Sequence, residues 1–126
     1  MTLYQEIDKA QAGHGLWKSR LARAIASGEA KISPQQAAAD DCCDFGRWLY
    51  ALPPHTHRSP LYNSVRKLHA QFHKQAALVL RLALAGHRDV AKLAMMPGSG
   101  FQRVSDDLAK ALRRWQQASL RNKPSK

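Results

Sequence analysis

Residues 60–86, PLYNSVRKLHAQFHKQAALVLRLALAG, decide the fold class of this chain. Mainly apolar residues recur there at alternating steps of four and three, which is the spacing of the buried face of a bundle helix. They are Leu61, Val65, Leu68, Phe72, Gln75, Val79 and Leu82. Pro60 suits the first turn of a helix and Gly86 suits its end. The stretch therefore predicts one long helix with one face toward a core.

The same spacing occurs near both ends of the chain. A first helix over residues 2–27, ended by Gly28, turns inward Leu3, Ile7, Ala10, His14, Trp17, Leu21 and Ala24. A last helix turns inward Phe101, Val104, Leu108, Ala111, Trp115 and Ala118. Gly13 and Gly15 weaken the first helix, and we interpret them as space for a neighbouring backbone.

Shorter elements join these three helices. Residues 28–40 form a connector with a short helical turn after Pro34, and residues 42–52 form a short helix capped by Asp41. Residues 88–96 form another short helix. The chain is thus expected to be all-α, an antiparallel four-helix-type bundle of three long and two short helices. We expect a single domain over residues 1–121 and a basic flexible tail over residues 122–126.

The composition limits the class of protein. A chain of 126 residues, 44% of them hydrophobic, can bury one core without disulfides. The adjacent Cys42 and Cys43 cannot form a disulfide framework and suit a reducing compartment. The N-terminus has no apolar signal core, and the most apolar stretch contains Arg81 and is too short to span a bilayer. We therefore expect a cytoplasmic protein without membrane insertion.

The net charge of +11 is unevenly distributed. Residues 1–54 carry six basic and six acidic side chains, residues 55–100 carry seven and one, and residues 101–126 carry seven and two. A basic helical nucleic-acid-binding protein with a structural zinc is therefore one interpretation of the sequence. Its candidate contacts are Arg66, Lys67, Lys74, Arg81, Lys110, Arg113 and Arg114. The other interpretation of these residues is a solvated basic surface.

Four side chains form a candidate metal site. His69 and His73 are four residues apart, so their rings leave the same face of the helix about one turn apart. His14 is at an inward position midway along its own helix and can meet them at the same level. Cys43, in the first turn of its helix, is expected to be a thiolate because the helix N-terminus favours negative charge. Three histidines and one cysteine make a closed set for zinc.

Each of these residues also has a structural interpretation without a metal. The histidine pair could lie on a surface, Cys43 could be a small buried side chain, and His14 could be bonded to a carbonyl in the core. Cys42 projects about 100° away from Cys43 around the helix, which predicts a packing role. His55 and His57 lie in a predicted exposed loop, and His87 lies at a helix end.

The sequence argues against an enzyme. The pair reads H-A-Q-F-H, with Ala70 at a position where a zinc protease needs a glutamate. The chain has only Glu6 and Glu29 and lacks the E-x-x-H pairs of di-iron bundles. Four protein ligands would also leave no open position on zinc for water.

Three segments resemble the chemoreceptor zinc-binding (CZB) domain family. They are H-G-L-W-K from His14, C-D-F-G-R-W-L-Y from Cys43 and H-A-Q-F-H from His69. The block from Cys43 is the specific part of the resemblance. By position, the resemblance implies that zinc is held by His14, Cys43, His69 and His73.

The resemblance also implies a function. Such domains are usually part of bacterial chemoreceptors or diguanylate cyclases and report zinc or reactive chlorine through the cysteine and the metal. We therefore expect a sensory or regulatory zinc-binding module in bacterial signal transduction or chemotaxis. Because no receptor or cyclase sequence is present, the chain is either a stand-alone protein that acts on its signalling partner in trans or an excised domain, and we expect the first. The family implies a homodimer.

Overall fold

The computed structural model describes residues 2–41 and 43–121, and in this part of the chain every regular element is helical. The three long helices are α1 (Leu3–Ser27), α4 (Pro60–Leu84) and α6 (Gly100–Arg121). The short ones are α2 (Pro34–Ala38), α3 (Asp44–Tyr50), the 3₁₀ turn η1 (Thr56–Arg58) and α5 (Arg88–Ala94). The expected all-α bundle is confirmed, with α2 as a further short helix. The predicted tail over residues 122–126 lies outside the described residues.

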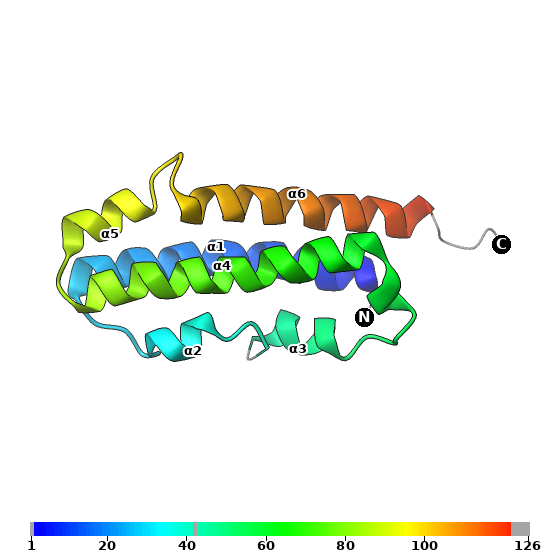
Figure 1. Cartoon of the computed structure of the whole chain (residues 1–126), viewed down its shortest axis with the longest axis horizontal. Helices are drawn as coiled ribbons and strands as arrows, with labels where there is room; N and C mark the ends of the chain where they lie inside the picture. Colours follow the sequence, from blue (N-terminus) through cyan, green and yellow to red (C-terminus); the bar gives the residue numbers. More distant parts are fainter. Residues whose placement is uncertain (1, 42, 122–126) are drawn as a thin grey trace.

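The helices form a bundle in up-and-down order. Figure 1 shows α1 and α4 running in one direction, while α6 and the pair α2–α3 run in the other. The broken segment α2–α3 thus takes the place of the second helix of a four-helix bundle. Helix α4 packs against α1, α2 and α6, so it is central to the fold.

Local signals set the ends of the long helices. The Thr2 hydroxyl accepts from the Gln5 amide, and the Gln5 side chain accepts from the Thr2 amide, which completes a capping box for α1. Gly28 ends α1 with φ of 74°, a backbone conformation that favours glycine. Ser59 caps α4 immediately before Pro60.

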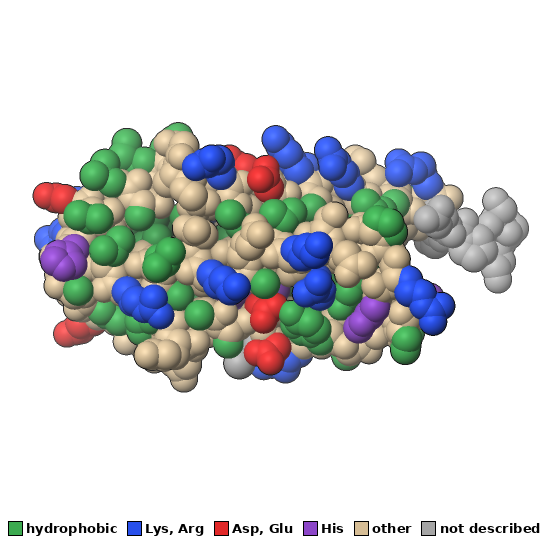
Figure 2. All heavy atoms as spheres, viewed as in Figure 1, with side chains coloured by type: hydrophobic (Ala, Val, Ile, Leu, Met, Phe, Trp, Pro, Cys, Tyr) green, Lys and Arg blue, Asp and Glu red, His purple; other side chains and the backbone are tan. Residues whose placement is uncertain are grey.

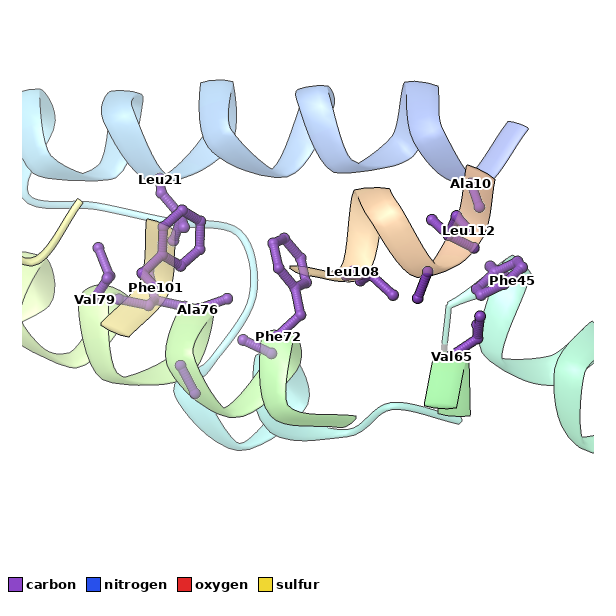
Figure 3. Packing of buried hydrophobic residues seen from close by; sticks show 14 of the residues in the cluster. Ala10, Leu21, Phe45, Val65, Phe72, Ala76, Val79, Phe101, Leu108 and Leu112 are labelled. Atoms are coloured by element: carbon purple, nitrogen blue, oxygen red, sulfur yellow. The ribbon is translucent and has the colours of Figure 1, made fainter. Parts of the chain in front are cut away.

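The buried side of α4 is wider than the sequence spacing predicts. Leu61, Leu68, Gln75 and Leu82 are only half-buried, whereas the line through Val65, Phe72, Ala76 and Leu80 is fully buried. The reason is that α4 has neighbours on three sides, which bury more of its circumference than one partner would. In Figure 3, Phe72 of α4 points into the interior that Leu21 of α1 and Leu108 of α6 also enter.

The glycines of α1 do not admit a neighbouring backbone, so that interpretation is wrong. A Cβ atom at Gly13 or Gly15 would meet nothing within 4 Å. Gly46 in α3 does have a close backbone neighbour: a Cβ there would lie 1.8 Å from the Asp40 carbonyl oxygen. The backbone at residues 40–41 therefore crosses directly over α3.

Candidate metal centre

Three potential ligand atoms converge between α3 and α4. Cys43 Sγ lies 3.4 Å from His69 Nε2 and 3.6 Å from His73 Nε2, and the two Nε2 atoms are 3.1 Å apart. Both histidines are 2% exposed and Cys43 is half-buried. One short helix and one turn of α4 thus bring a sulfur and two nitrogens to a single point.

These separations fit a tetrahedral zinc ion. Zinc–nitrogen bonds near 2.0–2.1 Å and zinc–sulfur bonds near 2.3 Å place neighbouring tetrahedral ligands about 3.3 Å (N–N) and about 3.6 Å (N–S) apart. Thiolate and imidazole ligands also match the chemical preference of zinc. The donor set and its spacing therefore fit this ion.

A backbone carbonyl orients His73. Its Nδ1 lies 2.9 Å from the carbonyl oxygen of Ala37 in α2. A carbonyl can only accept, so Nδ1 carries the proton and Nε2 of the neutral ring keeps its lone pair toward Cys43 and His69. His69 Nδ1 is buried and has no hydrogen-bond partner. The polar contacts of the His69 ring are therefore made by Nε2.

Cys43 is the N-cap of α3 and not a residue of its first turn. Its sulfur accepts from the Gly46 amide at 3.2 Å, so the predicted cap at Asp41 is wrong. The helix begins at Asp44 because this sulfur takes the capping position. Cys42 lies outside the described residues, so its predicted packing role stays a prediction.

The thiol of Cys43 does not have the lowered pKa that the helix N-terminus suggested. Burial raises its pKa, and the amides of Gly46 and Phe45 and the charge of Arg47 oppose this rise only in part. Desolvation is stronger here because the sulfur lies against the bundle. In the metal-free protein Cys43 is thus a thiol at neutral pH.

The pKa values of the three histidines are lowered, which is opposite to the change at Cys43 and favours metal binding. Burial lowers the pKa of His69 to about 3, with smaller effects from His73 and His14. Burial also lowers the pKa of His14 to about 4, with help from His73 and Lys18. It lowers the pKa of His73 as well, although the bond to Ala37 opposes the change. All three rings are neutral at pH 7, the form that binds metal.

His14 lies beside this group but not within it. The ligand atoms of Cys43, His69 and His73 all lie within 4.8 Å of one another, and His14 is not part of that set. Its half-buried ring packs against Phe72 at 4.7 Å between centroids. His14 and the three converging residues line one cleft of about 450 Å³ along α1. The bundle thus places His14 at the expected level.

Aromatic side chains enclose the three converging residues. Trp17 of α1 packs edge-on against His73 at 5.5 Å, and Phe45 of α3 packs edge-on against His69 at 5.2 Å. Trp48 contacts Phe45 and also Trp115 of α6. An aromatic shell therefore surrounds the three residues, and it ties the site to α1 and α6.

The remaining histidines lie elsewhere. His55 and His87 are exposed. His57 is half-buried and stacks on Tyr62 at 4.5 Å, so the expectation that it is solvent-exposed is wrong. The short turn η1 folds its ring onto α4. None of these three belongs to the metal-ligand group of the described residues.

Sequence reasoning missed two backbone contacts of the site. One is the Ala37 carbonyl that orients His73, and the other is the Asp40 carbonyl that lies over Gly46. No side-chain pattern marks the first. The second has a signal, since a glycine inside a short helix often marks a close backbone approach.

The pKa shifts predict how zinc affinity depends on pH. Binding displaces a proton from Cys43 but none from the histidines, whose lowered pKa values leave them neutral. Affinity should therefore rise about tenfold per pH unit between about pH 6 and pH 8, the slope for one proton. Competition titrations against a chelator of known proton affinity measure this slope. A slope above two below about pH 6.5 would mean that the histidines titrate in the native protein and would contradict this assignment.

Comparison with known proteins identifies the family. The model of the chemoreceptor zinc-binding domain matches residues 14–80, more than half of the chain. No curated protein and no solved structure gives a significant match. Zinc is the metal of this family, and Cys43, His69 and His73 form a group that can hold it. The chain therefore belongs to the chemoreceptor zinc-binding (CZB) domain family.

Proposed function

We propose that this chain is a zinc-binding regulatory module that reports zinc or oxidant to a signalling protein. The observation that carries the proposal is the convergence of Cys43 Sγ, His69 Nε2 and His73 Nε2 at tetrahedral ligand spacing in a buried site. Family membership supports the sensory role. Bound zinc would supply a positive charge that holds the Cys43 sulfur as a thiolate.

The proposed ligand set is His14, Cys43, His69 and His73. His14 qualifies as the fourth ligand because it lines the same cleft and its neutral ring is close enough to influence the pKa of His69. It starts the segment that the family model matches.

The proposed role is binding without catalysis. Four protein ligands close a tetrahedral zinc site and leave no position for an activated water. Two carboxylates, Glu6 and Asp44, line the cleft, but a closed zinc site offers no bound water for them to activate. Such a closed site is better suited to regulate a partner, through a change in the shape of this protein or in its affinity for that partner, than to catalyse hydrolysis.

The oxidant response is proposed to begin at Cys43, the one sulfur of the set. Its thiolate attacks the chlorine of hypochlorous acid and releases hydroxide, and water then replaces chloride to give a sulfenic acid. The sulfur is thereby oxidised by two electrons and donates more weakly to a metal. Because Cys43 is also the cap of α3, the same change weakens the start of that helix.

The effect should stay local because α3 is held separately at its two ends. At the far end, the Tyr62 hydroxyl donates to the Leu49 carbonyl at 3.2 Å, and Tyr50 bonds to Asp40. The histidines stay on α4, whose buried line is independent of the sulfur. Loss of order would therefore be confined to residues 41–52, which include α3, and a partner would read this surface.

Hydrogen exchange tests the sensing proposal. Hypochlorite treatment of the zinc-loaded protein should speed amide exchange in residues 41–52 and leave α4 and α6 unchanged, because only α3 loses its cap. Zinc release is measured in parallel.

Two cysteine variants serve as controls. Cys43→Ser should abolish the response, whereas Cys42→Ser should retain it. Unchanged exchange with zinc retained after oxidation would leave a purely structural zinc site and contradict the sensory role.

The thiol chemistry and the family suggest the cellular compartment, the partner and the assembly of this protein. A free Cys43 needs a reducing compartment, for which we propose the cytoplasm. Within the described residues, no helix combines the length and apolar character needed to cross a membrane. A chemoreceptor-like or cyclase-like protein in trans is the proposed partner, and a homodimer is the proposed assembly.

A further inference from the structure

One side of the bundle carries more Lys and Arg than Asp and Glu side chains. Residues 45–88 contain no aspartate or glutamate, so α4 is purely basic. Lys67, Lys74 and Arg81 are exposed and seven residues apart, which places them in one line along α4, opposite its buried side. The line is about 21 Å long at 1.5 Å per residue.

A second line of cations follows α6. Lys110, Arg114 and Arg121 are exposed and lie at steps of four and seven residues on the outer side of this helix. No acidic residue follows Asp107 in the chain. The Asp106 carboxylate already accepts from the Gln102 side chain at 2.8 Å.

Both lines belong to one face of the molecule. Helices α4 and α6 pack directly against each other. Figure 2 shows Lys and Arg side chains in a row over α4 and in a second row over α6. Among the described residues, none of the six cations in these lines has a carboxylate within ion-pair distance. We call this surface the α4–α6 face.

One predicted contact does not belong to this face. Arg66 is half-buried and close enough to Tyr50 of α3 to influence the pKa of that tyrosine, so Arg66 faces α3. The seven candidate contacts from the sequence thus separate into an outer set and one inner residue.

We propose that the α4–α6 face binds duplex nucleic acid through the phosphate backbone, independently of sequence. Two rows of cations on neighbouring helices can each contact one of the two phosphate rows beside a groove, where a duplex presents one charge per about 1.7 Å of its axis. Phosphate contacts of this kind position a protein but read no bases. The site is separate from the proposed zinc function.

The side chains between the cations favour a duplex over other anionic partners. The aromatic residues of α4 and α6, Tyr62, Phe72, Phe101 and Trp115, are all buried, so the face has no platform for stacking the bases of a single strand. Leu78, Leu84 and Leu120 are the large apolar side chains exposed on these two helices in the described chain. Three scattered leucines make no continuous stripe that could insert into a lipid bilayer.

Fluorescence anisotropy of the zinc-loaded protein with a labelled duplex of mixed sequence tests this proposal. Six phosphate contacts predict a slope of log affinity against log salt of about −5, a loss of about 10³-fold between 50 and 200 mM salt. The triple variant Lys67→Gln, Lys74→Gln, Arg81→Gln should reduce the slope to about −3. Zinc content and helix content should not change, because all three side chains are exposed.

A matched variant separates this face from net charge alone. Arg20→Gln, Arg23→Gln, Lys31→Gln removes the same charge from exposed positions on and beside α1, and the slope should stay near that of the unaltered protein. Equal losses in both triple variants would overturn the proposal. So would tighter binding to vesicles containing phosphatidylserine than to the duplex, or tighter binding to a single strand.

Discussion

Gly46→Ala is expected to lower zinc affinity about 10–100-fold, the range for changes that displace the supports of a metal ligand. The added Cβ, which is held rigidly by the helix backbone, would lie 1.8 Å from the Asp40 backbone carbonyl oxygen, so the backbone itself must move. Because the Gly46 amide donates to Cys43 Sγ, that movement shifts the sulfur. Overpacking of this kind costs about 1–3 kcal/mol, or about 4–12 °C in Tm. Chelator competition and calorimetry measure the two effects.

Gly15→Ala is the matched control, and it should act in the opposite direction. A Cβ at Gly15 meets nothing within 4 Å, and the residue is exposed in the interior of α1. Alanine there should raise stability by about 0.5–1 kcal/mol through helix propensity and leave zinc affinity unchanged. If Gly46→Ala were as harmless, the crossing of residues 40–41 over α3 would be wrong.

His69→Ala and His73→Ala should each reduce zinc affinity by more than the 100-fold limit of supporting residues. Each removes one of the converging nitrogens, and His73→Ala also leaves the Ala37 carbonyl without its donor.

X-ray absorption of the unaltered protein should report one sulfur and three nitrogens around one zinc per chain. Helix content should persist without metal, because the apolar core extends over α1, α4 and α6. Chelation should nevertheless lower Tm by mass action.

His55→Ala, His57→Ala and His87→Ala test the same assignment from the other side. All three should keep their zinc because none belongs to the converging group. His57 is the most demanding control, since its ring is half-buried and its removal disturbs the stack on Tyr62. Metal loss in this variant equal to that of His69→Ala, or a spectrum with two sulfurs, would refute the proposed ligand set.

Much of the fold and part of the site follow from the sequence because they depend on local geometry. Caps, helix ends and apolar spacing need only neighbouring residues, and the expected bounds of α1 and α4 agree closely with the structure. The nearness of His69 and His73 is likewise fixed by the four-residue spacing of one helix turn. The segment from Cys43 to Tyr50 also carried enough pattern to indicate the family.

Tertiary structure alone decided the features that depend on how separate elements rotate and approach. The buried arc of α4 widened because three neighbours surround it. The sulfur of Cys43 became a cap with a raised pKa because burial against the bundle outweighs the amides of its own helix. The Ala37 carbonyl reached His73, and the backbone at Asp40 crossed Gly46, because the connector folds back along α4. Such contacts join residues far apart in sequence, and no local spacing encodes the path that brings them together.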